Sequence, residues 1–197
     1  MNRRDVIKSS ALFLGYAVST TALSNLFISC KSEVQLNWKP VFLSNSQAQL
    51  LSEMTERILP RTKTPGAKDL NIDHFIDKML KDLLTPAEQK DFIAGLNAFE
   101  SACKSANGKS FVECTPEQQN AFLLKMDKEA AKFNPSVWGI DLGKPLEIPF
   151  FRRVKELTLL GFYTSQDIGE KVLSFLPIPG EYVACMPLAE IGNAWNE

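Results

Sequence analysis

The sequence predicts an all-α protein, an irregular small helical bundle of five to six helices with an extended, proline-rich C-terminal tail. Three stretches place a Gln or Glu three residues after a Ser or Thr, which is the capping box that begins many helices. After each box, apolar residues recur at three- and four-residue spacing, the period of an amphipathic helix. No run of alternating apolar residues is long enough to indicate a sheet. Helical segments without strands pack as a bundle.

Each predicted helix has its own start or stop signal. The capping boxes begin at Ser44, Thr85 and Thr115, and in the last two a proline occupies the first helical position, where its missing N–H costs nothing. Pro60 ends the first helix. Three further prolines keep the tail extended, because a proline fixes its own backbone and restricts the residue before it. The predicted helices cover residues 46–59, 72–84, 86–106, 116–132, 150–163 and 165–174.

The first thirty residues resemble an export signal. The chain begins MNRRDVIK, and the pair Arg3-Arg4 is typical of twin-arginine signals, which are addresses read by a receptor. The apolar stretch after Lys8 is diluted by polar residues, so it is marginal as a span of ~20 apolar residues and fits a signal peptide better. It ends at Ser29-Cys30, which resembles a lipoprotein processing site where Cys30 is acylated. The alternatives are a signal without lipidation, either cleaved or retained as an anchor.

The charge balance argues against a nucleic-acid partner. We divide the chain into a signal peptide at residues 1–30, a linker at 31–41 and a helical domain at 42–197, long enough for a real core. The whole chain carries a formal charge of −1, and its signal peptide carries +2, so the remainder carries −3. Nucleic-acid binding instead requires a basic face.

The sequence holds no recognisable catalytic or cofactor motif. His74 is the only histidine, whereas imidazole metal sites normally use more than one. Asp73 and Asp77 flank it one helical turn apart; we interpret them as a solvated helix edge, with a carboxylate-rich site as the alternative. There is no glycine-rich dinucleotide fingerprint, phosphate loop, His-Glu-x-x-His, haem attachment or G-x-S-x-G elbow. We therefore expect no catalytic residue, cofactor or metal in this chain.

Two cysteines are placed to form a disulfide. Cys103 falls in the last turn of the third predicted helix, and Cys114 falls just before the start of the fourth. If these helices form an antiparallel hairpin, both sulfur atoms lie at its mouth, and an exported domain can keep a disulfide. The alternative is a pair of buried free thiols. Cys185 is then left over, which indicates a partner on another chain or a free thiol.

Three stretches together resemble a known family. They are RILPRTKTPGAKDLNIDHFIDKML, PFFRRVKELTLLGFYTSQDIG and PIPGEYVACMP. In this order they look like the small subunit of bacterial gluconate 2-dehydrogenase, the subunit 3 family. The resemblance covers about residues 42–187, which is most of the chain after the signal.

The resemblance implies a partner and a role. Members of this family accompany a large flavoprotein of the glucose–methanol–choline type, which carries FAD, oxidises a sugar or sugar acid and passes electrons to a cytochrome c subunit with haem c or to another membrane acceptor. The small subunit is held to be non-catalytic. Its twin-arginine signal would export the folded flavoprotein with it, so the chain is expected in the periplasm, associated with the membrane. A lipid on Cys30 would be a departure from the family, and it would also tether the complex. The alternatives are a free-standing periplasmic lipoprotein that serves as a binding or structural module, and an enzyme in its own right.

The partner surface is expected at the end of the fifth helix and in the tail. From Leu157 the sequence LTLLGFY is apolar around nearly the whole helix, and such a helix must be buried on all sides. A small bundle has little capacity to surround it, so a partner could cover one side. Aromatic and Met residues in the tail are also typical of interfaces, although the tail could instead wrap its own bundle. We expect the interface at or beside Phe162, Tyr163, Tyr182 and Cys185.

Overall fold

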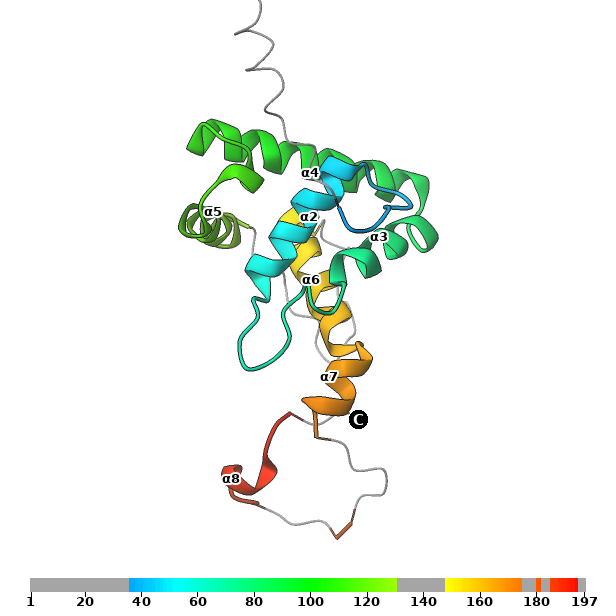
Figure 1. Ribbon diagram of the computed structural model, residues 1–197, viewed down its shortest axis with the longest axis vertical. Helices are drawn as coiled ribbons and strands as arrows, with labels where there is room; N and C mark the ends of the chain where they lie inside the picture. The colour runs from blue at the N-terminus through cyan, green and yellow to red at the C-terminus, as the bar shows by residue number, and fades with distance from the viewer. Residues whose placement is uncertain (1–35, 131–147, 175–179, 182–184, 195–197) are drawn as a thin grey trace, which may run out of the picture. The chain divides into compact units, whose positions relative to one another are not determined.

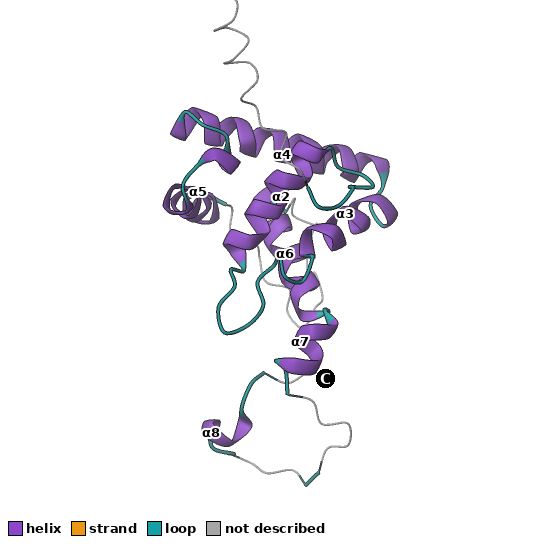
Figure 2. Ribbon diagram, in the orientation of Figure 1, coloured by secondary structure: helices purple, strands orange, loops and turns teal. Residues whose placement is uncertain are grey.

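The computed structural model describes residues 36–130, 148–174, 180–181 and 185–194, all within one unit that begins at Leu36. These residues form helices joined by loops and contain no β-strand, so the predicted all-α fold is confirmed (Figures 1 and 2). The elements are α2 (Asn45–Ile58), α3 (Ile72–Asp82), α4 (Pro86–Asn107), the 3-10 turn η1 (Phe111–Glu113), α5 (Pro116–Glu129), α6 (Phe150–Tyr163), α7 (Gln166–Lys171) and α8 (Leu188–Ile191).

All three predicted capping boxes are present. The side chains of Ser44, Thr85 and Thr115 each accept a hydrogen bond from the backbone N–H three residues later, and the Gln or Glu at that position reaches back to the cap. These reciprocal bonds satisfy backbone groups that the first turn of a helix leaves without partners. The boxes therefore fix where α2, α4 and α5 begin.

Several helix ends and the tail differ from the prediction. Helix α3 ends at Asp82 rather than at residue 84, and α7 ends at Lys171 rather than at residue 174. The fourth predicted helix was expected to reach residue 132, but α5 ends at Glu129 because Ala130 takes an extended backbone conformation. The tail was expected to be extended, yet it contains the single turn α8. Pro187 begins this turn with a φ of −57°, and Gly192 ends it with a φ of 75°, a value that glycine adopts without strain.

Helix α6 lies in the middle of the helical unit. It contacts α2, α3, α4, α5 and α7. Its glycine permits a close approach to α3, since a Cβ at Gly161 would lie 2.8 Å from a ring carbon of Phe75 on that helix. Residues Phe151, Val154, Leu157, Thr158 and Gly161 are the buried positions of α6. The buried face of α6 therefore fixes this helix in the bundle, and the same helix contains Phe162 and Tyr163 of the predicted partner surface.

An aromatic cluster connects α4, η1, α5 and α6. The ring of Phe99 packs edge-on against Phe111 and Phe122, with centroid distances of 5.2 and 5.1 Å, and lies 6.3 Å from Phe150. Phe92 packs edge-on against Phe150 at 5.3 Å. Edge-to-face pairs at these distances stabilise a core beyond the burial of their apolar area. The cluster joins the turn between α4 and α5 to the start of α6.

Asp77 holds the segment that leads into α2. Its side chain is fully buried and accepts hydrogen bonds from the backbone N–H groups of Val41 (2.6 Å), Phe42 (3.2 Å) and Leu43 (2.8 Å). Just upstream, the ring of Trp38 stacks on the ring of His74 at a centroid distance of 4.0 Å. The segment before α2 is thus attached to α3 by a carboxylate and by a ring pair.

These contacts correct the interpretation of Asp73 and Asp77 as a solvated helix edge. Both side chains are buried, Asp73 with 5% and Asp77 with 0% of its surface exposed. The reason is that the segment before α2 covers this side of α3, and its backbone donors compensate the buried carboxylate of Asp77.

Candidate functional site

The described residues offer exposed apolar surfaces and hollows that could bind a partner. Among them, no three His, Cys, Asp or Glu side chains are close enough together to hold a metal ion. In the same part of the chain, no helix has the length and apolar character needed to cross a membrane. The features of these residues that could serve a partner or ligand are exposed apolar faces, hollows and cysteines.

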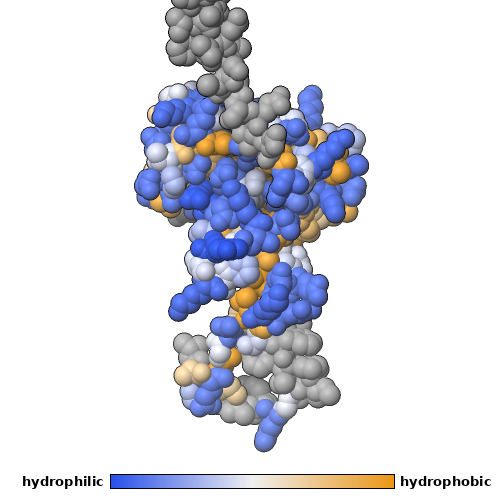
Figure 3. All heavy atoms as spheres, viewed as in Figure 1, coloured by the Kyte–Doolittle hydropathy of each residue, from blue (hydrophilic) through white to orange (hydrophobic). Residues whose placement is uncertain are grey.

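The end of α6 exposes an apolar face. Leu159 has 36% of its surface exposed, Leu160 has 43% and Tyr163 has 53%, while Leu157 and Gly161 on the opposite side are buried. Figure 3 shows hydrophobic atoms in orange along α6 and toward α7, between hydrophilic residues on either side. We call Leu159, Leu160 and Tyr163 the α6 face. The described residues of the chain leave it open to solvent.

The predicted interface residues occupy different environments. Phe162 is half-buried and packs against the core, while its ring meets that of Tyr163 edge-on at 5.3 Å. Cys185 is exposed and has a φ of 59°. Tyr182 lies outside the described residues, as do Arg3, Arg4 and Cys30. Of the four predicted interface residues, Tyr163 and Cys185 are accessible to a partner in this structure.

Sequence reasoning did not single out Leu159 and Leu160. The signal was present in the helical register, because positions 159, 160 and 163 share one face of a helix while 154, 157, 158 and 161 share the other. The sequence alone does not show which of the two apolar faces the bundle covers. The packing of Gly161 against Phe75 decides this.

An open hollow adjoins the α6 face. It has a volume of about 750 Å³ and lies at the junction of α6 and α7, where Tyr163, Thr164, Ser165, Gln166, Gly169, Glu170 and Leu173 line it. Its lining is largely uncharged, with one carboxylate at Glu170. An exposed aromatic ring beside a concave surface is the arrangement that protein interfaces favour for an anchoring residue.

A second groove lies among α2, α5 and α6. It has a volume of about 320 Å³, and one wall is apolar, with Leu123, Leu124 and Phe151. An ion pair between Lys155 Nζ and Asp127 Oδ1 at 3.2 Å lies at the same groove. Arg57 also lines this groove, and its buried Nε has no hydrogen-bond partner among the described residues. The groove is therefore charged, whereas the α6 face is apolar.

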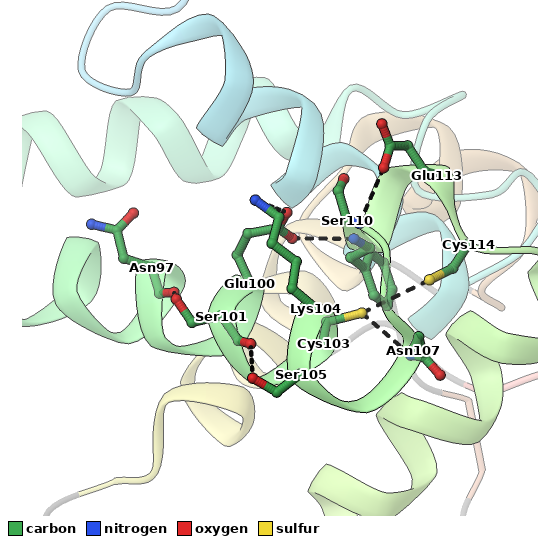
Figure 4. Close-up of polar contacts among 11 residues, drawn as sticks. Asn97, Glu100, Ser101, Cys103, Lys104, Ser105, Asn107, Ser110, Glu113 and Cys114 are labelled. Carbon is green, nitrogen blue, oxygen red and sulfur yellow. Dashed lines mark hydrogen bonds and ion pairs between the residues drawn. The ribbon is translucent and has the colours of Figure 1, made fainter.

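The predicted cysteine partners are in contact at the turn between α4 and α5 (Figure 4). The Sγ atoms of Cys103 and Cys114 lie 3.9 Å apart, and both residues are buried. The side-chain amide of Asn107 donates a hydrogen bond to Cys103 Sγ at 3.5 Å. Burial raises the pKa of the Cys103 thiol to about 11, because the charged thiolate loses its water there. The structure places the two partners together, and the bond between them stays a prediction.

The turn that carries these thiols is held by hydrogen bonds from both sides. The N–H of Phe111 donates to Glu100 Oε2 at 3.2 Å, and the amide of Gln119 donates to the carbonyl of Phe111 at 2.9 Å. Within the turn, the N–H of Ser110 donates to the carboxylate of Glu113 at 3.2 Å (Figure 4). These bonds keep η1 between α4 and α5 with the ring of Phe111 fully buried.

Comparison with known proteins gives one family. No curated protein and no solved structure shows significant similarity to the chain. The family described as gluconate 2-dehydrogenase subunit 3 matches residues 45–180, a range that begins at α2 and includes α6, α7 and both thiols. A match over more than half of the chain, with the order of helices and the motifs already described, shows that this chain belongs to the gluconate 2-dehydrogenase subunit 3 family.

Proposed function

We propose that the chain is the non-catalytic small subunit of an exported, FAD-dependent dehydrogenase complex that oxidises the CH–OH group of a sugar or sugar acid. The observation that carries the proposal is the family match over residues 45–180, because the family is named for one subunit of an oxidoreductase. A subunit requires a partner, and the α6 face provides an apolar surface for one. The large flavoprotein subunit is the proposed occupant of this face and carries the FAD. A cytochrome c subunit is the proposed electron acceptor.

The proposed role of the chain is assembly and export. Its N-terminal sequence has the twin arginines Arg3 and Arg4 and a cysteine at position 30 in a lipoprotein-like setting. On this proposal the signal carries the folded flavoprotein across the membrane together with the small subunit. Acylation of Cys30 would then keep the complex at the periplasmic side of the membrane.

Removal of the α6 face tests the partner surface. The double variant Leu160→Ser, Tyr163→Ser is expected to recover at least tenfold less flavoprotein when a tagged chain is purified from cells that also produce the proposed flavoprotein subunit. Both side chains are at least 43% exposed, so the melting temperature of the isolated variant should stay close to that of the wild type.

A matched control distinguishes the loss of the α6 face from the effect of making any exposed apolar residue polar. Leu83 at the end of α3 is 67% exposed and does not belong to the α6 face, so Leu83→Ser should leave recovery unchanged. Equal recovery with the double variant would place the interface elsewhere. A free-standing lipoprotein would recover no flavoprotein with any of these chains, including the wild type.

The non-catalytic role has its own test. The purified chain alone is expected to show no flavin absorbance and no sugar-dependent reduction of an electron-accepting dye. Turnover by the isolated chain would contradict the proposal, whichever surface the partner uses.

A further inference from the structure

The turn between α4 and α5 contains two thiols with no described function. Cys103 lies near the end of α4, and Cys114 immediately follows η1 and precedes the cap Thr115 of α5. The Sγ atoms face each other across the mouth of the helix pair, 3.9 Å apart (Figure 4). Cys103 has none of its surface exposed and Cys114 has 6%, so neither thiol faces solvent as a free nucleophile would.

We propose that Cys103 and Cys114 are oxidised to an intramolecular disulfide that joins the end of α4 to the start of α5. Sulfur atoms in a disulfide lie about 2.05 Å apart, so the two must approach by roughly 2 Å. Side-chain rotation at Cys103 and a small shift of the extended residue Cys114 can supply this approach, because η1 between them is a short loop rather than a long helix. The inference concerns only this chain's own sulfur atoms, so it goes beyond the proposed role in the complex.

The third described cysteine does not compete for this bond. Cys185 lies in the tail and is exposed, whereas the sulfur contact recorded for Cys103 is with Cys114. Cys103 and Cys114 are eleven positions apart along the chain, which also makes them the closest pair of cysteines in the sequence. Proximity in the chain and in space therefore selects the same two residues.

The oxidation is a thiol–disulfide exchange with a disulfide-bonded oxidoreductase or an oxidised low-molecular-weight thiol. Cys114, the more exposed of the two, loses its proton and attacks a sulfur of the oxidant, which forms a mixed disulfide and releases one thiolate. Cys103 then loses its proton and attacks Cys114 Sγ, which expels the second thiolate. The two cysteines lose two electrons and two protons, and the oxidant becomes a dithiol or two thiols. An exported chain meets such oxidants after it leaves the cytoplasm.

Burial makes this reaction slow until the turn opens. The raised pKa of Cys103 keeps its thiolate scarce at neutral pH, and the hydrogen bonds of Phe111 hold η1 closed over the sulfur atoms. Once formed, the bond is protected from reductants by the same burial. It closes a loop of about a dozen residues, which in the chain-entropy model raises the melting temperature of a protein of this size by about 5–10 °C.

The test uses the full chain with Cys30→Ser and Cys185→Ser, so that only the pair remains. The reduced protein is unfolded in urea and refolded in the presence of oxidised glutathione, so that burial does not block the reaction. It is then denatured, alkylated with N-ethylmaleimide and weighed by mass spectrometry. The expected product is two hydrogens lighter than the reduced chain, carries no maleimide, and yields a linked peptide pair containing Cys103 and Cys114. The oxidised protein should also melt about 5–10 °C higher than the reduced protein.

Other products would overturn the proposal. Two maleimides per chain would show two free thiols that do not pair, and a stable glutathione adduct or a linked dimer would show that the sulfur atoms cannot reach each other. As a control, Cys103→Ser in the same background should keep a glutathione or maleimide on Cys114 and should melt at the same temperature with and without reductant. A disulfide that forms without raising the melting temperature would overturn the inference that it stabilises the fold.

Discussion

Replacing Asp77 by alanine is expected to destabilise the protein by about 3–4 kcal/mol. The carboxylate accepts three backbone hydrogen bonds, from Val41, Phe42 and Leu43, and no part of it reaches solvent. A hydrogen bond to a charged group contributes about 1.5–3 kcal/mol, and a buried donor left without a partner costs about 1–3 kcal/mol. The N–H of Leu43 is buried, so its loss of an acceptor carries the full cost of an unpaired donor. Val41 is half exposed, so water can replace part of its bond.

The loss should be visible in both global and local measurements. For a chain of this length, 1 kcal/mol shifts the melting temperature by about 2–4 °C, so Asp77→Ala should melt about 6–16 °C below the wild type. Urea unfolding gives the free energy directly. Hydrogen exchange should show the amides of residues 41–43 protected in the wild type and exchanging freely in the variant.

Two further variants make the test specific. Asp77→Asn keeps one acceptor oxygen without the charge, so it should fall between the alanine variant and the wild type. Asp82→Ala removes an exposed carboxylate from the same helix and should leave the melting temperature unchanged. The reasoning is refuted if Asp77→Ala unfolds within 1 kcal/mol of the wild type, on the scale of the loss argued above, or if exchange at residues 41–43 does not change.

Three other predictions concern export, lipidation and packing. Conversion of Arg3 and Arg4 to lysine should leave both the chain and its flavoprotein in the cytoplasm, and a flavoprotein that still reaches the periplasm by fractionation would contradict joint export. Cys30→Ser should release the chain from the membrane fraction, and unchanged membrane association with unchanged gel mobility would show that Cys30 is not acylated. Gly161→Val should destabilise the fold by about 1–3 kcal/mol in urea unfolding, because its Cβ would lie 2.8 Å from a ring on α3. Gly180→Val, where an added Cβ meets no atom of the described residues within 4 Å, serves as its control and should unfold like the wild type.

Local signals in the sequence were sufficient for most of the fold. The capping boxes at Ser44, Thr85 and Thr115 placed three helix starts within a residue, because a cap is a contact between neighbours in the chain. The end of α5 was not predictable in the same way. Ala130, Ala131 and Lys132 are good helix formers, and the first stop signal is Asn134-Pro135, so the sequence favoured a longer helix than the one that ends at Glu129.

Long-range packing accounts for what sequence reasoning missed. Asp77 was expected at a solvated edge because carboxylates usually face water, but it lies beside the apolar positions Ile76 and Leu80 of α3, on the side that the segment before α2 covers. The bonds that bury it join residues 34 to 36 positions apart. For α6, the sequence predicted one uncovered side but not which one. Only contacts with distant helices settle such questions.

The contacts of α2 bear on when the protein can fold during synthesis. α2 is the first helix of the described unit, yet it contacts α5 and α6, and α6 begins about 90 residues after α2 ends. Its buried positions Leu50, Leu51 and Met54 cannot be fully covered until α6 has left the ribosome. Translation at roughly 5–20 residues per second puts α6 about five to twenty seconds behind α2. The N-terminal residues are therefore complete well before the core can close, and any factor that binds them early meets an unfinished chain.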